Sequence, residues 1–130
     1  MPGFEALVAA ARGARRHAMA PYSGFAVGAA ILTRGGTIYT GVNVENASYG
    51  LTICAERVAL FKAISEGERD FAAVAVVTDT ATPTAPCGAC RQVLWEYAGD
   101  VPVILANLTS VVGRYTTSDL LPAPFDRRSL

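Results

Sequence analysis

Apolar residues recur every three or four positions along the first part of the chain, which is the spacing of an amphipathic helix. They are Phe4, Leu7, Val8, Ala11, Ala14 and Ala18. Residues 54–66 and 87–98 have similar helical patterns, and each segment is followed by a glycine that can end a helix. The sequence therefore predicts three main helices, and Thr117-Ser118-Asp119 offers a cap for one further turn.

Shorter runs of apolar and β-branched residues predict five strands, at residues 26–33, 37–44, 71–78, 101–106 and 111–115. Gly35-Gly36 between the first two is typical of a hairpin turn. Only about four residues join the last two strands, which is too short for a crossover, so we expect this pair to be antiparallel. The order of elements predicts an α/β fold, a three-layer α-β-α sandwich around a mixed five-stranded sheet.

Composition limits the function classes. The 130 residues fit a single domain spanning residues 1–130, because two smaller pieces would bury little core. Hydrophobic residues make up 52%, which leaves apolar surface for subunit association. Lys plus Arg and Asp plus Glu are both 11, so the basic excess of a nucleic-acid-binding protein is missing and a small-molecule substrate is favoured. No apolar run is long enough to predict a membrane span.

The three cysteines of the chain carry the main chemical signal. Their odd number and the lack of a secretory signal pattern favour a cytoplasmic protein whose thiols do not pair. Cys87 and Cys90 have the C-x-x-C spacing that lets two thiolates bind one ion, and Cys54 begins another predicted helix. The positive ends of both helices stabilise thiolates. Three ligands leave the fourth position of a zinc ion open, which predicts a catalytic rather than a structural site. His17 has no ligand spacing around it and is not expected to bind the ion.

Two kinds of charged residue adjoin these cysteines. Glu56 follows Cys54 by two positions, so it can lie beside the ion without binding it and carry protons. Alternatively, Glu56 could only complement the dipole of the helix. The three-ligand site beside it makes this second role the less favoured one. Three thiolates on Zn²⁺ leave a formal negative charge, which a guanidinium could offset by donating to sulfur. Arg57 and Arg91 are both candidates, Arg57 being preferred, and either could instead form a surface ion pair.

These residues match the established signature of zinc deaminases, a ligand-x-Glu segment followed by P-C-x-x-C. The chain resembles the short, homotetrameric, zinc-dependent cytidine deaminases of the cytidine/deoxycytidylate deaminase family. The matching segments are Pro21-Tyr22-Ser23-Gly24-Phe25-Ala26-Val27-Gly28-Ala29-Ala30, Asn43-Val44-Glu45-Asn46-Ala47-Ser48-Tyr49, Cys54-Ala55-Glu56-Arg57, Pro86-Cys87-Gly88-Ala89-Cys90-Arg91-Gln92, and Leu120-Leu121-Pro122 with Phe125.

The resemblance implies further roles. Asn43 and Glu45 correspond to residues that bind the ribose hydroxyls, and alternate positions of a strand can indeed point to one side. Phe25 corresponds to a residue packed near the pyrimidine, and Phe125 to one that stacks on the base in a neighbouring subunit's site. Spacing alone would assign both phenylalanines to the core or to a tail anchor. Residues 126–130, beyond Phe125, are expected to be mobile.

The implied reaction is the hydrolysis of cytidine and 2'-deoxycytidine to uridine and 2'-deoxyuridine with release of ammonia, in pyrimidine salvage. Zinc-activated hydroxide attacks C4, and Glu56 protonates N3 and then helps the amine leave. In the family, backbone groups at the positions of Ala55 and Cys87 contact the base edge. The resemblance further implies one zinc ion per subunit and a homotetramer whose sites are completed by neighbouring subunits.

Three alternatives remain open. A related deaminase could act on another nucleoside, such as the antibiotic blasticidin S, although Asn43, Glu45 and Phe125 favour the ordinary nucleoside. A polynucleotide-editing deaminase, by family resemblance, has parallel last strands and a basic surface, which the short 107–110 link and zero net charge oppose. A non-enzymatic zinc module would close the ion with four ligands and give Glu56 no role.

Overall fold

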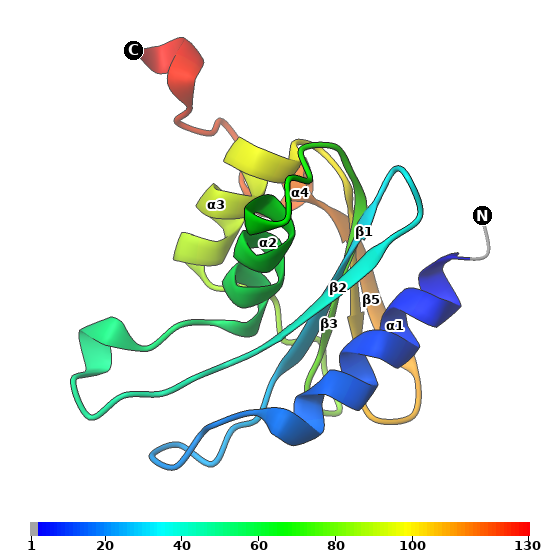
Figure 1. Ribbon diagram of the computed structural model, residues 1–130, viewed down its shortest axis with the longest axis vertical. Coiled ribbons are helices and arrows are strands. Elements are labelled where there is room, and N and C mark those ends of the chain that lie inside the picture. Colours follow the sequence, from blue (N-terminus) through cyan, green and yellow to red (C-terminus); the bar gives the residue numbers. More distant parts are fainter. Residues whose placement is uncertain (1–2) are drawn as a thin grey trace.

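A computed structural model of the protein describes residues 3–130 and places five strands in one sheet (Figure 1). The strands are β1 (Gly28–Thr33), β2 (Ile38–Val42), β3 (Phe71–Val77), β4 (Pro102–Ala106) and β5 (Val111–Thr116). They lie in the order β2-β1-β3-β4-β5. β3 pairs with β4 in parallel, and β4 pairs with β5 in antiparallel fashion. The mixed sheet and the antiparallel last pair are therefore confirmed.

Helices cover both faces of this sheet, which confirms the three-layer sandwich (Figure 1). The α-helices are α1 (Gly3–Ala14), α2 (Ala55–Ser65), α3 (Gly88–Ala98) and α4 (Thr117–Leu120), and the short 3-10 helices are Arg15–His17, Tyr49–Leu51 and Arg127–Ser129. Helix α1 packs on one face, and α2 and α3 lie together on the other. Within residues 3–130, no helix is long and apolar enough to cross a membrane.

The alternation of side chains along the strands creates two separate apolar layers. On β1, Ala29 and Ile31 pack under α2 and α3, whereas Ala30 and Leu32 pack under α1. β3 likewise contributes to both layers, as expected for an apolar strand buried on its two faces. The close approach of α2 depends on Gly41, because a Cβ there would lie 2.4 Å from the carbonyl oxygen of Ala55. This packing places the first residue of α2 directly against the sheet.

The observed strands begin and end within two residues of the predicted bounds, and the differences have local causes. β1 begins at Gly28 rather than at residue 26. The carbonyl of residue 26 and the N–H of residue 27 form hydrogen bonds with side chains and not with a neighbouring strand. Nε of Arg15 donates to the carbonyl of Ala26, and Oδ1 of Asn43 accepts from the N–H of Val27. The first helix also ends earlier, at Ala14, and continues as the 3-10 turn.

The one further helical turn predicted near the C-terminus is confirmed as α4, whereas two details of this region differ from the predictions. The cap of α4 is Thr116, whose side chain accepts from the N–H of Asp119 while the Asp119 carboxylate accepts from the N–H of Thr116. The segment 126–130, expected to be mobile, contains the 3-10 helix Arg127–Ser129 and is bonded to α3 through Asp126. The expectation failed because it considered only position in the chain, and not the hydrogen bonds available to the tail.

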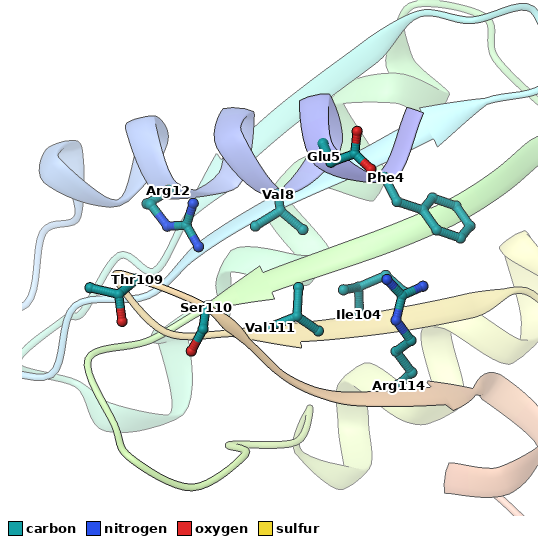
Figure 2. A pocket seen from close by; sticks show the side chains of 9 residues that line it. All are labelled: Phe4, Glu5, Val8, Arg12, Ile104, Thr109, Ser110, Val111 and Arg114. Atoms are coloured by element: carbon teal, nitrogen blue, oxygen red, sulfur yellow. The ribbon is translucent and has the colours of Figure 1, made fainter. Parts of the chain in front are cut away.

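A hollow of about 230 Å³ lies between α1 and β5, on the face of the sheet away from α2 and α3 (Figure 2). Nε and Nη2 of Arg12 both donate to the carbonyl of Asn107 at 3.1 Å, which ties α1 to the β4–β5 turn. At the other end of the hollow, the Arg114 guanidinium lies 5.8 Å from the centre of the Phe4 ring. The two arginines thus join the walls of this hollow.

Candidate active site

The three cysteine sulfurs converge where the first residues of α2 and α3 meet. Cys54 and Cys87 are the N-cap residues of these helices, with extended backbone, and Cys90 lies in the first turn of α3. Sγ of Cys87 lies 3.6 Å from Sγ of Cys54 and 3.6 Å from Sγ of Cys90. Sulfurs bound tetrahedrally at about 2.3 Å from one zinc ion are about 3.8 Å apart. The spacing fits three ligands of a single zinc ion, and the cysteines are not joined in disulfides.

The charges of this cluster also suit a cation. The hydrogen bond with Cys90, helped by Arg57, lowers the pKa of Cys54 to about 5. The same bond and burial raise the pKa of Cys90. One thiolate is therefore stable by itself, whereas three thiolates within 4.8 Å of one another repel. A divalent cation would remove this repulsion and allow all three sulfurs to ionise.

Glu56 is buried beside the sulfurs, with only 6% of its surface exposed. Burial, followed by the charge on Cys54, raises the pKa of its carboxyl to about 7. A carboxyl that titrates near neutrality can both accept and donate a proton at physiological pH. Its place in the first turn of α2 brings the carboxyl next to Cys54 and Cys90, and its role as proton carrier stays a prediction.

The two arginines next to the ligands have different partners. Nη2 of Arg57 donates to Sγ of Cys54 at 3.4 Å, and this bond raises the pKa of Arg57. Nε and Nη1 of Arg91 instead donate to the carbonyls of Pro86 and Leu120 at 2.7 and 2.9 Å. Arg57 is thus the guanidinium that contacts a ligand sulfur, while Arg91 holds the backbone before Cys87 to the end of α4.

A cavity of about 230 Å³ opens beside the sulfurs and Glu56. Its lining residues are Phe25, Val27, Asn43, Thr52, Ile53, Cys54, Ala55, Glu56, Val76, Thr78, Thr84, Ala85 and Cys87. The walls are mostly apolar, with few polar groups, as is usual for a small-molecule site. Next to this cavity lies a hollow of about 340 Å³, which is separate from the one between α1 and β5 and is called the second hollow below. It is lined by Tyr22, Ser23, Glu45, Asn46, Tyr49 and Thr52. Thr52 lines both, so the two spaces adjoin.

Asn43 and Glu45 lie at the cavity and at the adjoining hollow, respectively. The Asn43 amide bridges the backbone of the loop before β1, because Oδ1 accepts from Val27 and Nδ2 donates to the carbonyl of Phe25. The carboxylate of Glu45 accepts from the hydroxyl of Ser23 and from the N–H groups of Tyr22 and Ser23. These bonds lower the pKa of Glu45, and the bond from the Ser23 hydroxyl has the largest effect. Both side chains are therefore held in place before any ligand binds.

The other expected substrate contacts divide into two groups. Phe25, Ala55 and Cys87 line the cavity, as their expected roles require. Phe125 does not line it within the same chain, and its side chain is 62% exposed. His17, which is exposed and accepts from Arg16, is not part of the cysteine cluster.

Sequence reasoning missed several residues of the site. Ser23 orients Glu45, and Thr78 and Thr84 add hydroxyl groups to the cavity wall. Ser23 belongs to the matching segment at residues 21–30, but no bonding role was predicted for it, although a serine hydroxyl in a turn can donate to a carboxylate. The two threonines flank a loop rich in Thr, Ala and Pro, where nothing in the local pattern distinguishes a cavity residue from a linker residue.

A cation site of three cysteines with an open position, beside a buried carboxyl and a small cavity, defines the zinc-dependent hydrolytic deaminases. The family model described as the cytidine and deoxycytidylate deaminase zinc-binding region matches residues 3–106. The chain therefore belongs to the cytidine and deoxycytidylate deaminase family, and it is a zinc-dependent deaminase.

Relatives extend this similarity over nearly the whole chain. A cytidine deaminase of Sporosarcina psychrophila is 51% identical over 127 residues, which are 97% of this chain and 93% of the relative. The crystal structure of a cytidine deaminase from Burkholderia pseudomallei aligns with a TM-score of 0.91 at 52% identity, covering 94% of this chain and 98% of the other. A blasticidin-S deaminase of Bacillus cereus is 31% identical over 109 residues, covering 78% of this chain and 77% of the relative.

Proposed function

We propose that the protein hydrolyses cytidine and 2'-deoxycytidine to uridine and 2'-deoxyuridine and releases ammonia, as a step of pyrimidine salvage. The observation that carries this proposal is the pair of adjoining spaces that share Thr52. The cavity beside Glu56 has room for a ring, and the second hollow presents an ionised carboxylate, Glu45. A nucleoside has the matching two parts, a flat base and a sugar with hydroxyl donors.

The residues around the cavity supply the chemistry of such a reaction. A zinc ion held by Cys54, Cys87 and Cys90 would make a water molecule acidic enough to act as nucleophile near neutral pH. Glu56 takes one proton from this water and passes it to N3 of the base, while the hydroxyl bonds to C4. Glu56 then takes the proton of that hydroxyl and gives it to the amine, so that the carbonyl forms at C4, the C4–N bond breaks and ammonia leaves. Arg57 donates to Cys54 and limits the negative charge of the sulfur cluster. The apolar walls keep bulk water away from Glu56 and so strengthen its interactions.

Binding of the sugar is assigned to Asn43 and Glu45. Oε1 of Glu45 already accepts from the N–H groups of Tyr22 and Ser23, whereas Oε2 accepts only from the Ser23 hydroxyl and keeps a lone pair for a hydroxyl donor. Asn43 retains one N–H of its amide. Phe25 flanks the base, and the backbone groups of Ala55 and Cys87 are available to its edge.

We further propose a homotetramer in which Phe125 of one subunit closes the site of a neighbour. Large apolar side chains beside the second hollow support this assembly, with Tyr49 76% exposed and Leu51 70% exposed. Phe125 itself is exposed and away from the cavity of its own chain. Residues 1–130 act as one domain in this proposal, and the three free thiols favour a cytoplasmic location.

Two observations disfavour a polynucleotide substrate. The β4–β5 pair is antiparallel, unlike the parallel arrangement expected for the editing enzymes, and the chain has no net charge. The greater identity to cytidine deaminases than to the blasticidin-S deaminase supports the ordinary nucleoside.

A cytidine absorbance assay tests the proposal directly. We expect ammonia release from cytidine that stops when a zinc chelator is added, together with much slower turnover of blasticidin S and of single-stranded oligonucleotides. The proposal would be refuted if the zinc-loaded protein released no ammonia from cytidine. Oligonucleotide deamination at the rate of cytidine would replace it with the editing function.

A further inference from the structure

The chain beyond α4 returns onto α3 and is bonded there at consecutive points. Nε2 of Gln92 donates to the carbonyl of Phe125 at 2.7 Å. Nε1 of Trp95 donates to Oδ2 of Asp126 at 2.9 Å. Gln92 and Trp95 are three positions apart and therefore lie on one face of α3. The carbonyl of Phe125 and the side chain of the residue that follows it are thus both attached to this helix face.

Asp126 is the main attachment point. It is only 9% exposed, and besides the Trp95 indole it accepts from the backbone N–H and the guanidinium of Arg128, with Nη2 at 2.7 Å. These bonds hold the pKa of Asp126 well below its usual range, and the bond from the Arg128 side chain has the largest effect. A buried carboxylate with charged and neutral donors is a strong local anchor, because charge-assisted bonds are the stronger ones. The tail therefore has a specific place on α3.

The segment before Phe125 is stiff as well. Pro122 and Pro124 restrict the backbone, and Ala123 between them has φ of 50°. Residues other than glycine avoid this left-handed region and remain in it only where the surroundings impose it. Phe125 is consequently held between a turn of restricted backbone and the Asp126 anchor, and the residue as a whole is 62% exposed.

The geometry points to Asp126 and Trp95 as positioning residues for Phe125, which together hold its ring in the orientation that a neighbouring subunit's site requires. This inference rests on the proposed role of Phe125 in closing that site. A tail that is ordered before the substrate binds does not have to be immobilised during binding, which favours affinity. Asp126 and Trp95 do not line the cavity beside Glu56. Loss of the anchor should therefore change KM for the substrate rather than kcat.

The test compares Asp126→Ala and Trp95→Phe with Arg127→Ala, a matched control in the same tail. Arg127 also reaches α3, but only through an ion pair with Glu96 at 3.7 Å whose arginine side chain is 78% exposed, and such exposed pairs contribute little. We expect Asp126→Ala and Trp95→Phe to raise KM for cytidine roughly three- to tenfold, with kcat within about twofold of wild type. Asp126→Asn, which keeps an acceptor for the indole, should recover part of the loss. Arg127→Ala should behave as wild type.

Tryptophan fluorescence reports the anchor independently of activity, because Trp95 is the only tryptophan of the chain. Release of the tail should expose the indole, so acrylamide should quench the fluorescence of Asp126→Ala more efficiently than that of wild type. Zinc content and mass in solution identify variants that fold and assemble. If Asp126→Ala fails this check, Trp95→Phe, which keeps the aromatic ring, carries the kinetic test.

The double variant Phe125→Ala with Asp126→Ala completes the test. Positioning predicts that its KM equals that of Phe125→Ala alone, because the anchor has nothing left to position. Additive effects would overturn the inference, as would an unchanged KM in Asp126→Ala with a released indole. A Phe125→Ala variant with wild-type KM would refute the role of Phe125 and with it the positioning role. Cytidine turnover by the wild-type protein tests the proposed function separately.

Discussion

Replacing Glu56 by glutamine tests the chemistry of the site while keeping its shape. The amide has the size of the carboxyl but cannot carry a proton, and the side chain is buried, so solvent has poor access to its position. A well-placed general acid or base contributes about 10²- to 10⁴-fold to a rate. We expect kcat for cytidine to fall by about that factor in Glu56→Gln, with zinc retained at one ion per chain.

The same substitution should not destabilise the protein. Burial raises the pKa of Glu56 to about 7, which means that the native fold disfavours the ionised carboxyl at neutral pH. A difference of this size corresponds to about 3 kcal/mol as an upper bound, because a cation beside the carboxyl would reduce it. Glutamine avoids this cost, so the unfolding temperature of the variant should equal or exceed that of wild type. Loss of activity without loss of stability is the pattern expected of a catalytic residue.

Steady-state deamination of cytidine, zinc analysis and thermal unfolding are the required measurements. Glu66→Gln is the matched control, because Glu66 is an exposed acid at the other end of α2. We expect it to leave kcat unchanged. A zinc-loaded Glu56→Gln protein that keeps more than about a tenth of wild-type kcat would refute the proton-carrier role.

The remaining predictions concern the metal and the helix that carries its ligands. Removal of zinc by a chelator should abolish deamination and lower the unfolding temperature, and added zinc should restore both; full activity of metal-free protein would contradict the metal site. Arg57→Gln should weaken zinc binding by about 10- to 100-fold in a chelator competition, because Cys54 loses its charged donor, and unchanged affinity would rule out this role. Gly41→Ala should lower the free energy of unfolding by about 1–3 kcal/mol in a denaturant titration, because the new Cβ would lie 2.4 Å from the Ala55 carbonyl oxygen. Gly50→Ala, where no atom lies within 4 Å of the added Cβ, is its control, and equal stability of the two variants would show that α2 can move away.

The secondary structure was accessible from sequence because its signals are local. The alternation and spacing of apolar residues identified each main strand and helix, and the short link before β5 determined the direction of that strand. The C-x-x-C spacing and the neighbouring glutamate identified a metal site, because ligand chemistry depends on residue type and on positions within one helical turn. Precise element ends were less accessible, since Arg15 and Asn43 take backbone groups that a longer β1 would use.

The sequence by itself thus determined the elements, the metal ligands and the acid beside them. Only the tertiary structure decided which arginine contacts sulfur, how Ser23 holds Glu45, and that the tail is anchored by Asp126 on Trp95. Each of these contacts joins side chains whose directions depend on how α2, α3 and the connecting loops pack. A local pattern records the preference of a residue for helix, strand or turn, whereas a hydrogen bond across the fold depends on positions set by many distant residues.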